Sequence, residues 1–235
     1  MDRFDSHLHL SSKSIPVMSA IVVTGSSRGL GLELVKQLFG RVSETSGLLI
    51  VTARRCTPAL SEAIAQSKGS AVSVPLDVTD EEQVARSVEE VRSTLNGHSL
   101  NILLNCAGVH GEIHGKIALI QCIPLMQNSA VKEIINMRVH SSGFGSITSA
   151  QDYIYALCPA YKISKAALNA LTVQYALSYR DEGFTIVAVI QDDMGGKNAD
   201  LTLSHGAEAV LDIVAVLETK DNGCFRNLCT RMGRV

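Results

Sequence analysis

A glycine-rich segment between an apolar strand and an amphipathic helix is the feature that most restricts how this chain can fold. The segment reads Thr24-Gly25-Ser26-Ser27-Arg28-Gly29-Leu30-Gly31, and it follows the apolar run Ala20-Ile21-Val22-Val23. Leucines then recur at positions 30, 34 and 38, the spacing of one helix face. Glycines at such a turn let the backbone approach a phosphate, and the start of the helix attracts its charge. The segment therefore predicts a nucleotide site, with an ordinary glycine-rich turn as the alternative for the glycines alone.

Apolar runs and helical stripes alternate along the rest of the chain. Strands are expected at 48–51, 71–74, 102–104, 134–137 and 185–190, because continuous apolar runs are typical of strands buried on both faces. One helix is expected to begin at a capping box of Thr79 and Glu82, and another to run from 161 to about 179. This alternation predicts an α/β fold in a single domain: a Rossmann-type doubly wound parallel sheet, with its ligand crevice at the carboxyl ends of the strands.

Length and composition agree with one packed domain. The chain has 235 residues, of which 46% are hydrophobic, and its formal net charge is −2. Such a length can bury a two-sided sheet, and a charge near zero provides no attraction for nucleic acid or an anionic membrane. Residues 1–18 are polar and rich in His and Ser. We expect them to be a flexible N-terminal extension, and residues 19–235 to form the nucleotide-binding domain that contains the glycine-rich turn.

Targeting and redox features favour the cytoplasm. No apolar run reaches the roughly 18 residues of a membrane span, and residues 1–18 lack the apolar core of a signal peptide. The six cysteines are scattered without a CxxC pair, which favours reduced thiols over disulfides or a zinc site. His7 and His9 form an HxH pair of the kind found in metal-dependent hydrolase barrels, but the rest of the chain predicts a Rossmann sheet. No metal is therefore expected.

Basic residues near the glycine-rich turn indicate which dinucleotide it would bind. An enzyme that prefers NAD carries an acid at the end of the second strand, where it holds the ribose 2′-hydroxyl. This chain has Arg54 and Arg55 after that strand, and Arg28 inside the turn. Guanidinium groups suit a 2′-phosphate that an acid would repel, so we predict NADP(H) as the cofactor. The alternative is that these arginines are solvated surface residues.

Two polar residues end later strands on the side of the expected crevice. Asp77 follows the third strand, where it would accept from the adenine amino group or else start the next helix. Asn105 follows the fourth strand, at the start of Asn105-Cys106-Ala107-Gly108. Both are candidates for contacts with the nucleotide.

Tyr161 and Lys165 are the strongest indication of chemistry. They lie four residues apart in an expected helix, so their side chains share one face, one turn from each other. A phenol with a pKa of about 10 is a weak acid at neutral pH, and a nearby cation lowers that pKa. Beside a nucleotide site the pair predicts proton transfer. The alternative is a core-facing tyrosine with a solvated lysine nearby.

These motifs, in this order, resemble those of the short-chain dehydrogenases/reductases over nearly the whole chain after residue 18. The matching segments are TGSSRGLG, DVT after the third strand, NCAG where the family has NNAG, SSGFGS and YKISKAAL. The segments INM and DMGGKNADLT are similar to the subgroup of C-factor and sniffer-type carbonyl reductases. The resemblance implies hydride transfer between NADP(H) and a small-molecule carbonyl or alcohol, as in the reduction of an aldehyde, ketone or quinone.

The resemblance also implies roles for individual residues. Tyr161 would be the general acid, Lys165 would lower its pKa and bind the nicotinamide ribose, and Ser142 would hold the substrate oxygen. Ser142 lies 19 residues before Tyr161, farther than in most relatives, so Ser141 and Ser146 remain alternatives. The implied cofactor-binding residues are Gly25, Ser27, Arg28, Gly29, Leu30, Gly31, Arg54, Asp77, Val78, Asn105, Ala107, Gly108, Tyr161 and Lys165.

Three departures from the family pattern bear on activity. The stretch between Gly108 and Asn136 is short, and it lacks the first half of a long helix, including the asparagine that relays protons to the catalytic lysine. After the sixth strand, Gln191-Asp192-Asp193 stands where a Pro-Gly turn is expected, and Arg138-Val139-His140 is inserted before the serines. These differences fit a divergent active enzyme, a catalytically impaired member or a mis-spliced gene model. An impaired member would act as a cofactor-binding regulatory or interaction protein.

The helix expected at 161–179 is apolar nearly all round, which predicts a contact with another molecule. A surface helix normally has one apolar stripe and a charged opposite face. Relatives pair this helix with its symmetry mate, so the resemblance implies a homodimer. The alternative is a helix covered by the chain's own N-terminal extension.

Overall fold

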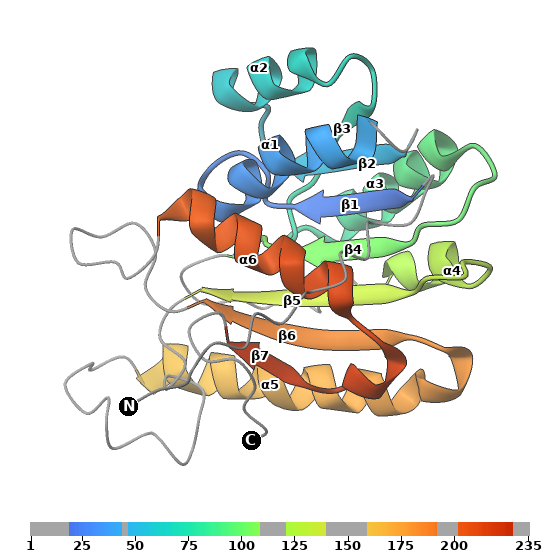
Figure 1. Ribbon diagram of the computed structural model, residues 1–235, viewed down its shortest axis with the longest axis vertical. Coiled ribbons are helices and arrows are strands. Elements are labelled where there is room, and N and C mark those ends of the chain that lie inside the picture. Colours follow the sequence, from blue (N-terminus) through green and yellow to red (C-terminus); the bar gives the residue numbers. More distant parts are fainter. Residues whose placement is uncertain (1–18, 44–46, 109–120, 140–158, 192–201, 228–235) are drawn as a thin grey trace, which may run out of the picture.

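The computed structural model describes residues 19–43, 47–108, 121–139, 159–191 and 202–227, and it contains one sheet with helices on both faces (Figure 1). The strands are β1 Ala20–Thr24, β2 Leu48–Ala53, β3 Ala71–Pro75, β4 Ile102–Asn105, β5 Glu133–Val139, β6 Thr185–Gln191 and β7 Phe225–Asn227. The helices are α1 Gly29–Ser43, α2 Pro58–Gln66, α3 Glu81–Leu95, α4 Ile123–Met126, α5 Pro159–Ser178 and α6 Leu203–Val216. Two short 3-10 helices, η4 Arg180–Glu182 and η5 Thr219–Asp221, stand beside β6 and β7 in the sequence.

All strand pairs are parallel, and the strand order is β3-β2-β1-β4-β5-β6-β7. The chain builds outward from β1 to β3, returns to the middle of the sheet, and then builds outward from β4 to β7. The reversal between β1 and β4 is the point at which doubly wound folds bind their ligands. The predicted Rossmann-type doubly wound parallel sheet is confirmed.

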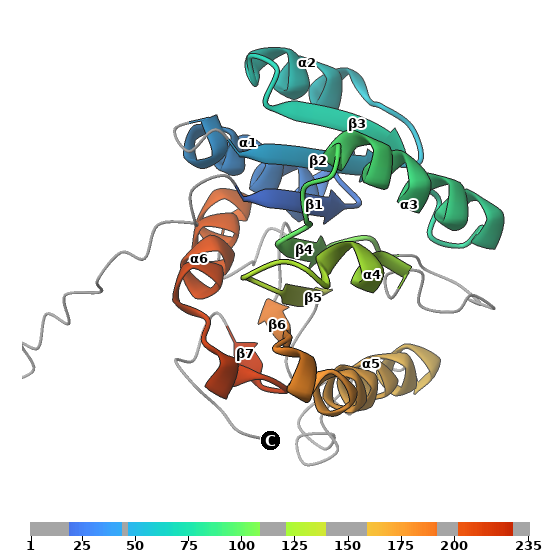
Figure 2. The ribbon, with the colours of Figure 1, turned by 90° about the vertical axis from the view of Figure 1, so that its right-hand side faces the viewer.

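Two apolar layers lie on opposite faces of the sheet, because successive side chains of a strand point to opposite sides. Ile21 and Val23 of β1 belong to the layer under α1 and α6, whereas Ala20 and Val22 belong to the layer under α3, α4 and α5. Figure 2 shows these two groups of helices on either side of the sheet. The buried strands thus read as the continuous apolar runs seen in the sequence.

The start of α3 differs from the sequence prediction. Asp80 is the N-cap residue, and its side chain accepts from the backbone N–H of Gln83 at 3.0 Å. Thr79 instead donates its hydroxyl to Asp77 at 2.7 Å. The predicted capping box of Thr79 and Glu82 is therefore wrong, because the neighbouring aspartate is an equally good cap one residue later.

The sequence prediction did not include α2, α6 or β7. The start signal of α2 was present, since Thr57 caps it and Pro58 occupies its first turn. β7 has three residues and pairs with β6 at the sheet edge. A strand of that length is too short to produce a recognisable periodicity.

Candidate functional site

A row of polar side chains crosses four adjacent strands at the level where β1 and β4 end. Thr52 of β2 is in register with Thr24 of β1, Thr24 with Asn105 of β4, and Asn105 with Asn136 of β5. All four residues are buried. Each stands two positions after a core residue of the layer under α3, α4 and α5, so the row faces that layer. We call these four residues the polar row.

The glycine-rich turn packs directly on the loop that follows β4. A Cβ on Gly25 would lie 2.8 Å from the Cα of Ala107, and one on Gly31 would lie 2.4 Å from the carbonyl oxygen of Gly25. These distances leave no room for a side chain at either position. Gly25 also has φ of +72°, a conformation that favours glycine. Close backbone packing therefore joins the ends of β1 and β4.

Hydrogen bonds hold the same turn between the strands on either side of β1. Oγ1 of Thr24 accepts from the backbone N–H groups of Cys106 and Ala107, at 3.1 Å each. The backbone N–H of Ser26 donates to the carbonyl of Thr52 at 2.9 Å. The turn is thus fixed to β4 on one side and to β2 on the other.

The remaining side of the turn is open. A Cβ on Gly29, which has φ of +59°, or on Gly108 would meet no atom of the described residues within 4 Å. α1 begins at Gly29, and the first N–H groups of a helix carry partial positive charge. Open glycine positions beside a helix start leave room and partial positive charge for a phosphate group. The residues present therefore fit a dinucleotide.

Charged residues lie beside this turn at the ends of β2 and β3. Arg28 and Arg54 are exposed, while Asp77 and Val78 are half-buried. Oδ1 of Asp77 accepts from the hydroxyl of Thr79 at 2.7 Å and from its backbone N–H at 3.0 Å. These bonds, with a smaller contribution from the Arg54 guanidinium, hold the pKa of Asp77 below its ordinary value. Asp77 is ionised at neutral pH, and it does not cap α3.

A chain of hydrogen bonds runs from the polar row to α5. Nδ2 of Asn105 donates to Oδ1 of Asn136 at 2.8 Å, and Nδ2 of Asn136 donates to Oγ1 of Thr172 at 3.1 Å. The hydroxyl of Thr172 donates in turn to the backbone carbonyl of Leu168 at 2.8 Å. Oδ1 of Asn105 is buried without a partner among the described residues. Sequence reasoning missed Thr172, although a lone threonine in a mostly apolar part of the helix was a usable signal.

α5 carries Tyr161 and Lys165 one helical turn apart, as expected. The helix begins at the edge where the strands end, so both residues lie in its first two turns at that edge (Figure 1). Lys165 is half-buried, and the side chain of Tyr161 lies outside the described residues. Ser142, its alternatives Ser141 and Ser146, and the segment expected to hold the Pro-Gly turn also lie outside them. The roles of Tyr161, Lys165 and Ser142 stay predictions.

The connection between β4 and β5 contains only the four-residue helix α4 within its described part, residues 121–132. Ile123, Leu125 and Met126 of this helix are buried. The backbone N–H of Leu100, just before β4, donates to the carbonyl of Leu125 at 2.9 Å. The end of α4 therefore covers the amino-terminal end of β4 (Figure 1), whereas Cys122, just before this helix, lies nearer the polar row.

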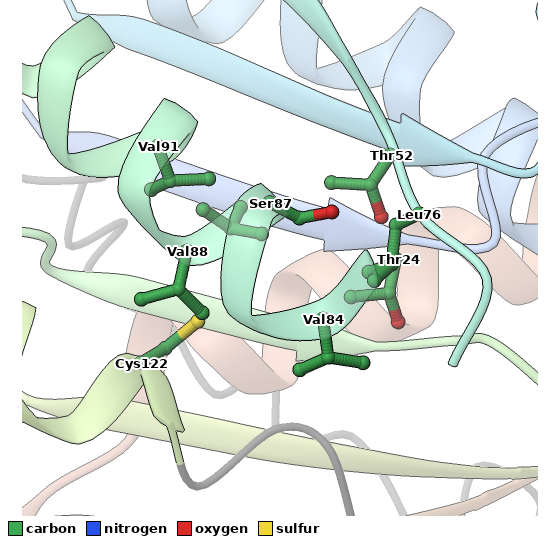
Figure 3. Close-up of a pocket in the computed structure, with 9 residues that line it drawn as sticks. Thr24, Thr52, Leu76, Val84, Ser87, Val88, Val91 and Cys122 are labelled. Atoms are coloured by element: carbon green, nitrogen blue, oxygen red, sulfur yellow. The ribbon is translucent and has the colours of Figure 1, made fainter. Parts of the chain in front are cut away.

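A small cavity lies between α3 and the ends of β1 and β2 (Figure 3). Its walls include Thr24 and Thr52 from the strands, Ser87 and Val88 from α3, and Cys122, and its volume is about 20 Å³. This is room for one water molecule. Oγ1 of Thr52, which lacks a hydrogen-bond partner in the described part of the chain, belongs to a residue of this wall. The cavity is too small for a cofactor or a substrate.

Two thiols lie near the polar row, the half-buried Cys106 and the buried Cys122. Burial raises the pKa of Cys106 to about 12 and the pKa of Cys122 to about 12, so both stay protonated at neutral pH. The described ranges hold no cluster of His, Cys, Asp or Glu side chains suited to a metal ion, and His7 and His9 lie outside them. None of the helices in those ranges is long and apolar enough to span a membrane.

Comparison with known proteins finds relatives over most of the chain. Residues 19–196 match the family model described as short chain dehydrogenase. An uncharacterised oxidoreductase of Saccharomyces cerevisiae is 27% identical and is matched over 87% of this chain and 93% of its own length. The NADPH-bound carbonyl reductase from chicken fatty liver has a TM-score of 0.76 and 27% identity, covering 93% of this chain and 99% of that one. The carbonyl reductase Sniffer of D. melanogaster has the same fold, with a TM-score of 0.76, 24% identity, and coverage of 90% and 97%.

Proposed function

Because this chain belongs to the short-chain dehydrogenase family, as its motifs predict, we propose that it is an NADP(H)-dependent oxidoreductase that reduces an aldehyde, ketone or quinone. The observation that carries the proposal is the turn at the switch point. Gly25 and Gly31 pack on neighbouring backbone there, while Gly29 and Gly108 leave the adjoining space open. The proposal also covers the predicted domain of residues 19–235 and a cytoplasmic location.

The proposed cofactor site lies along this open side. The turn and the start of α1 would hold the pyrophosphate, and Arg28 and Arg54 would pair with the 2′-phosphate. Similarity to a carbonyl reductase that binds NADPH supports a nicotinamide cofactor. When bound, NADPH would supply the hydride. The other residues proposed to line the site are Ser27, Leu30, Asp77, Val78, Asn105, Ala107, Tyr161 and Lys165.

The proposed proton donor is Tyr161. Its phenol gives a proton to the carbonyl oxygen of the substrate. The Lys165 cation, one turn away, favours this proton transfer because it stabilises the phenolate that Tyr161 becomes. Ser142 holds the same oxygen, with Ser141 and Ser146 as alternatives. The position of Tyr161 and Lys165 at the start of α5, on the edge where the strands end, supports this assignment.

We also propose a homodimer formed through α5. Exposed residues repeat along this helix at intervals of three and four and form one stripe: Ile163, Ala167, Ala170, Gln174 and Leu177, with the exposed Ser164 and Ser178 beside its two ends. Ile163 is 69% exposed and Leu177 is 50% exposed. Large apolar groups at both ends and small alanines between them allow a second helix to approach closely.

The short stretch between Gly108 and Asn136 favours a second candidate function. A family member that lacks the asparagine expected to relay protons to the catalytic lysine would keep the cofactor site and lose turnover. Such a protein would act as a cofactor-binding regulatory or interaction protein. The turn at the switch point is common to both candidates, so cofactor binding alone does not separate them.

One experiment on the purified protein distinguishes the two. NADPH consumption is followed by absorbance with a panel of aldehydes, ketones and quinones, and NADPH binding is titrated by fluorescence on the same preparation. Turnover with any member of the panel supports the reductase. Binding of NADPH without turnover across the panel supports the second candidate, and the absence of both overturns the two together.

A further inference from the structure

The hydrogen-bond chain from Asn105 to α5 connects the loop beside the glycine-rich turn with the helix that carries the proposed acid. Its members are almost inaccessible: Asn105 is 6% exposed, Asn136 is 9% exposed and Thr172 is 0% exposed. The direction of each bond is set, since Thr172 gives its only hydroxyl hydrogen to Leu168 and accepts from Asn136. A buried chain of this kind holds its members in one arrangement, because each unpaired group would carry a desolvation cost.

Few side chains of the described part of α5 are fully buried. Of its residues 162–178, Thr172 and Ala176 are the two that are buried. Asn222 donates to the backbone carbonyl of Ala176 at 2.7 Å, which fixes the second half of the helix at β6. Thr172 is the attachment point nearer to Lys165 and Tyr161. Its hydroxyl binds Asn136 of β5, and Asn136 binds Asn105 of β4.

The same chain begins next to the proposed cofactor site. Asn105 directly precedes Cys106 and Ala107, whose N–H groups bind Thr24 and whose backbone packs on Gly25. A shift of Asn105 relative to Thr172 would therefore change the distance between the cofactor loop and the start of α5.

We propose that Asn105, Asn136 and Thr172 are positioning residues that set where α5 places Tyr161 and Lys165 relative to the loop after β4. This inference rests on the reductase function proposed above. None of the three needs to touch the reacting atoms: Asn136 and Thr172 act through the backbone of α5. Because general acid catalysis depends on distance, a displacement of about 1 Å is expected to lower turnover by as much as about 100-fold.

The test compares Thr172→Val with a matched control. Valine keeps the shape of threonine and removes the hydroxyl, whereas Thr172→Ser keeps the hydroxyl. Thr185→Val is the control, because Thr185 is 5% exposed and starts β6 at the opposite end of the sheet. Each variant is assayed for kcat, KM for NADPH, the pH dependence of kcat, and Tm.

We expect Thr172→Val to lower kcat at least about 10-fold with KM for NADPH changed by less than about 3-fold. The alkaline limb of kcat should move to higher pH, because a Lys165 farther from Tyr161 lowers the phenol pKa less. Thr172→Ser should have a kcat and a pH dependence close to those of the wild type. Thr185→Val should change Tm and leave kcat and its pH dependence unchanged. Equal kcat and equal pH profiles for the two valine variants, or failure of serine to restore activity, would overturn the inference.

A second variant separates positioning from stability. Combining Thr172→Val with Asn136→Leu and Asn105→Leu replaces all three side chains of the hydrogen-bond chain by apolar groups and leaves no buried amide unpaired, so Tm should recover in part while kcat stays low. Recovery of kcat together with Tm would overturn the inference. An inactive wild type would refute the proposed function instead, whereas an active wild type with an unaffected Thr172→Val variant would refute only the positioning role.

Discussion

The part of the sheet formed by β1, β2, β3 and β4 is held together differently from the part that continues through β5, β6 and β7. In the first part, α1 and α3 are helices of 15 residues each, and the turn before α1 touches the backbone after β4 without room for a Cβ. In the second part, α4 has four residues, and α5 is fixed by a few side-chain hydrogen bonds.

The difference concerns what each part needs in order to keep its geometry. Backbone contacts in the first part depend on glycines and are insensitive to the identity of most side chains. In the second part, besides apolar packing, the buried hydrogen bonds depend on individual amide and hydroxyl groups. We therefore expect cofactor binding to survive most substitutions, and turnover to be lost easily. The following predictions test that contrast, from the largest expected effect to the smallest.

Replacement of Tyr161 by Phe should remove turnover while leaving cofactor binding close to normal. The ring still packs, but the proton donor is gone, so kcat should fall by about 10²- to 10⁴-fold. Tyr175→Phe is the control on the same helix, since Tyr175 stacks on Tyr179 with ring centroids 6.3 Å apart and should tolerate loss of its hydroxyl. Steady-state kinetics and NADPH titration measure the two effects. Unchanged turnover would mean that Tyr161 is not the acid.

Two glycines of α1 should respond in opposite ways to the same change. Gly31→Ala forces a Cβ to within 2.4 Å of the Gly25 carbonyl oxygen, which should lower the free energy of unfolding by about 1–3 kcal/mol and weaken NADPH binding. The Cβ of Gly40→Ala would meet no atom of the described residues. This substitution should therefore raise the free energy of unfolding by about 0.5–1 kcal/mol. Urea denaturation measures both values. A stable Gly31→Ala variant that binds NADPH normally would contradict the proposed turn.

Replacement of Arg54 by Asp should change the cofactor preference. Loss of a charge-assisted hydrogen bond to the 2′-phosphate should cost NADPH binding about 1.5–3 kcal/mol, while NADH binding stays the same or improves. Arg92→Asp on α3 gives the same change in net charge away from the strand ends, and it should shift both affinities by less than about 0.5 kcal/mol. Fluorescence titration is the measurement. Equal affinity of the wild type for both cofactors would refute the NADP(H) assignment.

A glutamate at Leu177 should weaken the proposed dimer. Leu177 ends the exposed stripe of α5, and a charge there would be buried against the second helix. Leu203→Glu on α6 is the matched control, because Leu203 is also exposed and lies outside the proposed contact. Sedimentation at micromolar concentration should show a dimer for the wild type and control, and more monomer for Leu177→Glu. A wild type that is monomeric throughout would end this proposal.

Asp77 should make a small, pH-dependent contribution to stability. Its pKa is lowered in the folded state by the bonds from Thr79, so its stabilising effect is complete above the ordinary aspartate pKa of about 3.9. The effect is lost as the pH falls below that value through the folded-state pKa. Unfolding free energies of the wild type and Asp77→Asn should therefore differ at pH 7 and converge in acid. A difference that grows as the pH falls would contradict this linkage.

Much of the first part could be predicted from the sequence because its signals are local. The apolar runs of β1, β2 and β4, the glycine spacing and the leucine stripe of α1 each extend over a few residues, and the structure agrees with them. Predictions failed at the start of α3, where two neighbouring residues compete for one role, and at β7, which has three residues; α2 and α6 were also not predicted, although both begin at a threonine cap.

The sequence by itself determined the alternation of strands and helices, the family, and the glycines that a tight turn requires, since these depend on periodicity and backbone conformation. Only the tertiary structure decided that Asn105, Asn136 and Thr172 form one buried chain. Asn105 and Asn136 are 31 residues apart, and Asn136 and Thr172 are 36 apart. Their contact requires β4 to pair with β5 in a register that aligns both asparagines, and α5 to cover that face. A hydrogen bond acts over about 3 Å, so strand order and register decide its partners, and neither is contained in a local pattern.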